Sequence, residues 1–132
     1  MTLATTAIYA ALCAFWYIWL AFQVIKWRRD AQISIMTGGD QSMANRMRAH
    51  GNAAEYIPIF LILMAVNESM GTPWFILHLL GIVFLVGRVL HGLHFVQERE
   101  GLAWRFRGML MTFSAIALSA LGALAHGIAG QF

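Results

Sequence analysis

Long apolar stretches alternate with short polar ones along this chain of 132 residues. A helix needs roughly 20 mostly apolar residues to cross the hydrocarbon core of a bilayer. Each of the four apolar stretches reaches that length, so the pattern predicts an all-α membrane four-helix bundle with up-down topology, forming a single domain over residues 1–132. The predicted spans lie at about 3–27, 43–69, 73–96 and 105–129.

The polar connections carry the expected signals for helix ends. The first connection contains Gly38 and Gly39 and is predicted to be an exposed loop. Asp40 or Ser42 is expected to cap the second helix. At the tight second connection, Thr72 is expected to cap the third helix, with the following proline at its first position.

Composition supports a membrane protein over a soluble one. Hydrophobic residues make up 60% of the chain and charged residues only 11%, whereas soluble domains carry about 25% charged residues. Cys13 is the only cysteine, so no intramolecular disulfide is expected. It falls in the middle of a span, where a catalytic thiolate is not expected.

The basic residues gather around two of the three connections. Short cytoplasmic connections are enriched in Lys and Arg, so the first and third connections are expected in the cytoplasm and both termini outside. This rule also explains the net charge of +3 without a nucleic-acid partner. Lys26, Arg28, Arg29, Arg46 and Arg48 flank the first connection, and Arg99, Arg105 and Arg107 flank the third.

The second span carries a polar stripe at its cytoplasmic end. Asn45, Arg48, Asn52 and Glu55 recur at helical spacing, so they share one face. Ionisable groups at membrane depth are costly and face a partner or an aqueous cavity. Two interpretations remain open: an Arg48–Glu55 pair that locks helices together, or a ligand site. Pro58 is expected to bend this helix and open space beside it.

The third span repeats this pattern with Arg88, His91 and Phe95 on one face. Arg88 lies deep enough to need a carboxylate or a water-filled pocket, and Glu55 is the candidate partner. His91 is expected to form hydrogen bonds rather than to bind a metal, because no second ligand stands at suitable spacing. No metal site is predicted.

The fourth span opens with Arg105, Gly108 and Thr112 on one face, which small residues continue. Small residues at such steps favour close helix packing in lipid. Arg105 and Arg107, like Arg28 and Arg29, suit either membrane anchoring or ligand binding. Anchoring does not require Arg88 or a buried polar stripe. That surplus predicts an anionic ligand at the cytoplasmic end, beside an apolar region suited to joining a polar molecule to a hydrophobic one.

These residues resemble the family of membrane-associated proteins in eicosanoid and glutathione metabolism, which includes microsomal glutathione transferases and leukotriene C4 synthase. The resemblance runs from the first span to the fourth. It is supported by Arg28-Arg29, by Arg88-x-x-His91 and by Arg105-x-x-Gly108. The strongest match is Arg46-Met-Arg48-Ala-His50-Gly-Asn52-Ala-Ala-Glu55-Tyr56-Ile-Pro58-Ile-Phe60, which is similar to the family signature Arg-Ala-His/Gln-x-Asn-x-x-Glu-x-x-Pro-x-Phe.

The resemblance implies a homotrimer that binds glutathione, its co-substrate, between neighbouring subunits. Arg105 falls where the family places the arginine that activates the thiol, with Arg107 as the alternative, and Arg29 matches an arginine proposed to act on substrate. Where several members have a tyrosine, this chain has Phe95. The residues that the resemblance places at glutathione are Arg28, Arg48, Asn52, Glu55, Tyr56, Arg88 and His91.

Two functions from different classes follow. The first is a glutathione transferase or peroxidase of the bacterial inner membrane, with its site facing the cytoplasm, acting on a hydrophobic small molecule or a lipid. Arginine forks and one glutamate match the two carboxylates and the ammonium of glutathione. The alternative is a non-catalytic membrane protein that binds an anionic lipid or peptide in the same site. A transporter is less favoured, because no inverted repeat is evident.

Overall fold

The computed structural model describes residues 2–131 of the chain; Met1 and Phe132, the ends of the predicted single domain, lie outside this range. Within it, all regular structure is helical, as predicted. The helices contain 23 to 29 residues, which corresponds to about 35–44 Å, more than the roughly 30 Å of a hydrocarbon core. They are α1 (Ala4–Asp30), α2 (Gln41–Ser69), α3 (Trp74–Val96) and α4 (Ala103–Ala129), and each is apolar enough to cross a membrane.

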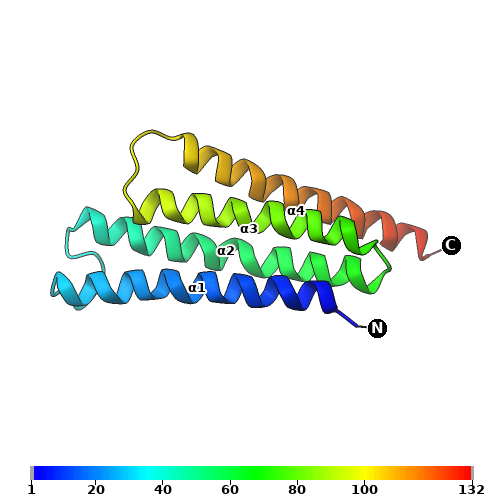
Figure 1. Cartoon of the computed structure of the whole chain (residues 1–132), viewed down its shortest axis with the longest axis horizontal. Helices are drawn as coiled ribbons and strands as arrows, with labels where there is room; N and C mark the ends of the chain where they lie inside the picture. The colour runs from blue at the N-terminus through cyan, green and yellow to red at the C-terminus, as the bar shows by residue number, and fades with distance from the viewer. Residues whose placement is uncertain (1, 132) are drawn as a thin grey trace.

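The inner pair of the bundle consists of α2 and α3. Both α1 and α4 contact this pair, whereas α1 and α4 do not contact each other within the described range. Figure 1 shows the four helices side by side in chain order. The connections α1–α2 and α3–α4 lie at one end of the bundle, and the termini lie with the α2–α3 turn at the other. The two arginine-rich connections therefore share one end, which we call the charged end.

The helix boundaries agree with the sequence pattern to within three residues. Asp40 caps α2, as expected, by accepting a 2.6 Å hydrogen bond from Met43 N. The expected cap of α3 is wrong by one residue, because Pro73 is the N-cap and α3 begins at Trp74. Pro73 has ψ 136°, which is extended rather than helical. The Thr72 hydroxyl instead lies 2.9 Å from His126 Nε2.

Aromatic and aliphatic side chains fill the centre of the bundle. Phe60 and Phe84 are fully buried and stack at 3.9 Å between α2 and α3. Large apolar side chains also cover the outer faces, where Phe15 and Phe106 are 68% and 66% exposed. Such a surface is unfavourable in water and suits lipid contact. Pro58 lies inside α2 without ending it, and it borders a groove of about 340 Å³ between α1 and α2.

Candidate functional site

The site is built on the close crossing of α3 and α4. A Cβ added to Gly108 would lie 2.7 Å from Gly87 O and 2.8 Å from His91 N. A Cβ on Gly87 would meet Gly108 O at 2.9 Å. The two helix backbones approach this closely only because both positions lack a side chain. The crossing confirms the packing role predicted for the small-residue face of α4, and it brings Thr112 against Arg88.

Arg88 lies at the centre of the site and is only 2% exposed. Its guanidinium donates to Thr112 Oγ1 at 2.8 Å, to Asn52 Oδ1 at 2.9 Å and to Met109 Sδ at 3.3 Å. The Tyr56 ring lies 5.1 Å from the guanidinium carbon, within cation–π range. Arg88 thus connects α2, α3 and α4 through one side chain.

The expected ion pair between Arg88 and Glu55 is wrong: within residues 2–131 the two side chains form no direct pair. Asn52 stands between them, because it is 3% exposed and directed into the bundle, whereas the Glu55 side chain is 52% exposed. Asn52 accepts from Arg88 and donates from Nδ2 to Glu55 Oε2 at 3.4 Å. A buried cation is therefore linked to a surface carboxylate through a neutral amide.

The outer part of the polar stripe is accessible. Arg48 Nη1 lies 3.5 Å from Glu55 Oε1, and both side chains are more than half exposed. Because both residues belong to α2, this pair does not lock two helices together, as one interpretation of the stripe required. The pair instead presents one cation and one anion beside Asn52, where a zwitterionic ligand would find both partners.

His91 and Arg105 are linked through Phe95. His91 is 3% exposed, and its ring centre lies 5.2 Å from that of Phe95. The Arg105 guanidinium carbon lies 5.5 Å from the centre of the same Phe95 ring. Arg105 itself is exposed at the start of α4, and so is Arg107. The contact with Phe95 connects Arg105 to His91, which lies one turn after Arg88 on α3.

An apolar hollow adjoins this part of the site. Its volume is about 360 Å³, and it is lined by Leu102, Arg105, Phe106 and Met109. Met109 also contacts Arg88, so the hollow and the buried guanidinium share a wall. A hydrophobic molecule in the hollow would lie beside the arginine at the start of α4.

Arg28 and Arg29 lie at the charged end but outside the Arg88 network. Arg28 donates to Met36 O at 3.2 Å and to Ile33 O at 3.5 Å, so it holds the α1–α2 connection. The Arg29 side chain is 76% exposed and lies 3.8 Å from Asp30. Within one chain, polar and cation–π contacts therefore connect Arg48, Asn52, Glu55, Tyr56 and Arg88, and ring contacts through Phe95 connect His91 with Arg105. Arg28 and Arg29 lie apart from both sets.

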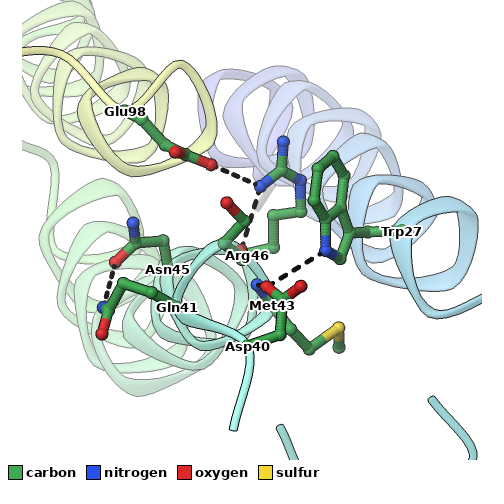
Figure 2. Close-up of polar contacts among 8 residues, drawn as sticks. Trp27, Asp40, Gln41, Met43, Asn45, Arg46 and Glu98 are labelled. Carbon is green, nitrogen blue, oxygen red and sulfur yellow. Dashed lines mark hydrogen bonds and ion pairs between the residues drawn. The ribbon is translucent and has the colours of Figure 1, made fainter. Parts of the chain in front are cut away.

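Sequence reasoning missed two partners of Arg88 and a second cluster. Thr112 was assigned to packing alone, although a hydroxyl beside Gly108 on the crossing face could have indicated a partner for a buried arginine. Nothing in the sequence pattern indicates Met109 as a partner of Arg88. The second cluster joins Trp27, Asp40, Arg46 and Glu98 at the charged end (Figure 2).

Among residues 2–131, no group of three or more His, Cys, Asp or Glu side chains is arranged to hold a metal ion.

Comparison with known proteins agrees with this architecture. The MAPEG family matches residues 6–125, nearly the whole chain. The chain is 36% identical over 121 residues to inner membrane protein YecN of Escherichia coli strain K12, and to its counterpart in strain O6:H1. Each match covers 90% of this chain and 89% of the relative. With four helices able to span a bilayer, the chain is an integral membrane protein, and it belongs to the MAPEG family.

Proposed function

We propose that this protein is a membrane-bound glutathione transferase or peroxidase, which activates the glutathione thiol for attack on a lipophilic electrophile or hydroperoxide. The single observation that carries the proposal is the buried Arg88, connected through Asn52 to the exposed Arg48–Glu55 pair. Membrane insertion and orientation do not need such a network. A buried guanidinium without a direct carboxylate is costly unless a ligand compensates its charge.

The charges of this network match those of glutathione. Glutathione carries two carboxylates and one ammonium. Arg48 is exposed and able to bind a carboxylate with two parallel hydrogen bonds, while Glu55 is able to accept from the ammonium. Arg88, His91 and Tyr56 would form the inner wall. Arg28 and Arg29 would contribute from a neighbouring subunit of a homotrimer, and such an assembly would account for their separation from Arg88 within one chain.

Arg105 is assigned to thiol activation and Arg29 to the second substrate. A guanidinium near sulfur favours the thiolate over the thiol, and the thiolate is the nucleophile. In the transferase reaction, the sulfur forms a bond to carbon as the leaving group departs with its electron pair. In the peroxidase reaction, two glutathiones are oxidised to the disulfide, while the hydroperoxide is reduced to an alcohol and water. The hollow beside Arg105 suits the hydrophobic substrate.

The proposed site faces the cytoplasm of a bacterial cell. Both arginine-rich connections lie at the same end of the bundle, and the positive-inside rule assigns that end to the cytoplasm. The relatives in Escherichia coli are named inner membrane proteins, which supports the same location here. Glutathione and lipophilic substrates would then reach the site from the cytoplasm and from the bilayer, respectively.

One observation favours a second candidate function. Phe95 stands where several family members have a tyrosine, so no hydroxyl is available there to contact glutathione or substrate. A non-catalytic protein that binds an anionic lipid or peptide in the same arginine-rich site would not need this hydroxyl. The two functions differ in ligand, so thermal stability in detergent distinguishes them. Stabilisation by millimolar glutathione supports the enzyme, and stabilisation by anionic lipid alone supports the binding protein.

The decisive test is turnover by the purified protein. We expect glutathione-dependent activity with chlorodinitrobenzene or cumene hydroperoxide. Arg105→Ala should reduce kcat by about a hundredfold, as removal of a charge-stabilising group does elsewhere. Arg107→Ala, which changes an exposed arginine two residues away, is the matched control and should retain activity. Absence of turnover with both substrates would contradict the enzymatic proposal, and full activity of Arg105→Ala would contradict the role of that residue.

A further inference from the structure

Arg46 joins three parts of the chain at the charged end (Figure 2). Its side chain is only 12% exposed. Nη1 donates to Ser42 O at 2.9 Å and to Glu98 Oε1 at 3.0 Å, while the guanidinium stacks on the Trp27 ring at 3.9 Å. Trp27 lies in the last turn of α1, Arg46 lies in the second turn of α2, and Glu98 lies in the α3–α4 connection. None of these contacts is used by the Arg88 network.

The Trp27 ring is itself held in place. Its Nε1 donates to Asp40 Oδ1 at 3.3 Å, and the same oxygen accepts from Met43 N at the start of α2. Asp40 thus caps α2 and orients the indole on which Arg46 lies. The Trp27 ring and Ser42 O therefore restrict the Arg46 side chain independently of Glu98, so the ion pair requires little further loss of side-chain freedom.

Glu98 shows that the connection is held in a specific conformation. Its φ of 50° lies in the left-handed region, which a residue other than glycine occupies at an energetic cost. Such a conformation persists when surrounding contacts impose it. The Ser42 hydroxyl and the Arg46 guanidinium hold the pKa of the Glu98 carboxyl below its usual range, so the carboxylate form is favoured.

The connection leads directly to Arg105. Arg99, next to Glu98, stacks on the Trp104 ring at 4.0 Å, and Trp104 precedes Arg105 in the first turn of α4. Leu102, the N-cap of α4, provides no side-chain hydrogen bond. The start of α4 is therefore positioned by the connection before it rather than by its own cap.

We propose that Arg46 and Glu98 form a clamp that holds the α3–α4 connection against α1 and α2 and so acts, through Arg99 and Trp104, as a positioning device for Arg105. The role of Arg105 in thiol activation rests on the function proposed above; the clamp does not. Neither Arg46 nor Glu98 contacts the proposed glutathione site, so both are positioning residues.

The free energy that one ion pair contributes suits the clamp to positioning the connection rather than to holding the fold together. A partly exposed ion pair contributes little to global stability, and its loss should raise the opening rate of the connection about two- to fivefold. The bundle should remain folded without it. The effect should therefore appear locally, in residues 97–107, and not in the unfolding temperature.

The test is hydrogen–deuterium exchange on the full-length protein in detergent. The amides of Gln97, Glu98 and Arg99 donate to carbonyls at the end of α3, so their exchange reports opening of the connection. Glu98→Gln and Arg46→Met should each exchange faster over residues 97–107. The matched control is Glu100→Gln, an exposed acid in the same connection, which should leave exchange unchanged. Because both partners act through one contact, the double variant should exchange no faster than the faster single variant.

A second readout separates the clamp from the proposed function. The pH at which bound glutathione becomes a thiolate, followed by ultraviolet absorbance, should rise in Glu98→Gln and stay constant in Glu100→Gln. Unchanged exchange in Glu98→Gln and Arg46→Met would overturn the clamp. Faster exchange with an unchanged thiolate titration would overturn its link to Arg105. Wild-type protein that binds no glutathione would contradict the proposed function, and exchange alone would then decide whether the clamp exists.

Discussion

The Arg88 guanidinium donates a 2.9 Å hydrogen bond to Asn52 Oδ1, and both side chains are almost completely buried. This contact ties α3 to α2 in the half of the bundle that carries the arginines. It also makes Asn52 the only link, within residues 2–131, between Arg88 and the Glu55 carboxylate. The Asn52 amide therefore serves two purposes: its oxygen accepts from the buried guanidinium, and its nitrogen donates to the exposed Glu55 carboxylate.

Asn52→Ala should destabilise the protein by about 1–3 kcal/mol, because a donor of the buried guanidinium loses its acceptor. The measurement is the free energy of unfolding in detergent, or the shift in unfolding temperature. Asn45→Ala is a suitable control, because Asn45 lies on the same face of α2 and its side chain accepts from the exposed Gln41 rather than from a buried charge. Equal losses of stability in the two variants would show that the Asn52–Arg88 hydrogen bond does not contribute to the free energy of unfolding.

Gly108→Ala should cost about 1–3 kcal/mol, because the new methyl group would lie 2.7 Å from Gly87 O and 2.9 Å from His91 Cβ, which forces α3 and α4 apart. Gly127→Ala, in the same helix, meets no atom within 4 Å and should be neutral or stabilising. Thermal unfolding of both variants checks this pair. If Gly108→Ala also displaces His91, glutathione binding should weaken along with stability.

Glu68, near the end of α2, caps the start of α1 from outside that helix. Its carboxylate accepts from Thr5 N at 2.8 Å and from Thr6 N at 2.7 Å, where the partial positive charge of the helix N-terminus lies. Glu68→Gln should therefore cost about 1 kcal/mol and increase amide exchange in the first turn of α1. Asp30→Asn, which removes an exposed acid at the opposite end of α1, should leave that exchange unchanged.

The clamp should also depend on pH. Glu98 has a lowered pKa in the folded protein, so its contribution is present above the unfolded value of about 4.3 and is lost as pH falls through the folded value. The charged groups around it are Arg46 of α2, Asp40 of the α1–α2 connection, and Arg99 and Glu100 of its own connection.

The measurement compares wild type with Glu98→Gln at each pH, which cancels the intrinsic pH dependence of amide exchange. The two proteins should differ at neutral pH and converge only as pH falls through the lowered pKa of Glu98 in the folded protein, where its carboxyl becomes protonated. A difference that persists unchanged at the lowest pH would mean that the Glu98 charge is not what holds the connection.

The sequence predicted the spans because each helix is a long apolar run, and it predicted the cap at Asp40 because capping is local. It also predicted which residues share the face of α2, since helical periodicity determines that. It did not predict the partner of Arg88, because Asn52 and Glu55 are one turn apart and only the packed helices decide which one points inward. The Arg46–Glu98 contact was equally inaccessible, because it depends on how the start of α2 and the distant α3–α4 connection meet in space.

Phe95→Tyr tests whether the site retains the architecture of its family. Phe95 lies between His91 and Arg105, with its ring 5.2 Å from the His91 ring and 5.5 Å from the Arg105 guanidinium. A tyrosine ring preserves both contacts and adds a hydroxyl where several family members have one. If glutathione binds here as proposed, the added donor should lower the KM for glutathione about tenfold, in line with 1–1.5 kcal/mol for one hydrogen bond. Phe95→Leu, the matched control, removes the ring and should weaken binding by loosening Arg105. The contrary result is a Phe95→Tyr variant that unfolds at the wild-type temperature but binds glutathione no better than wild type. Glutathione would then not approach this position, and an anionic lipid or peptide would be the favoured ligand.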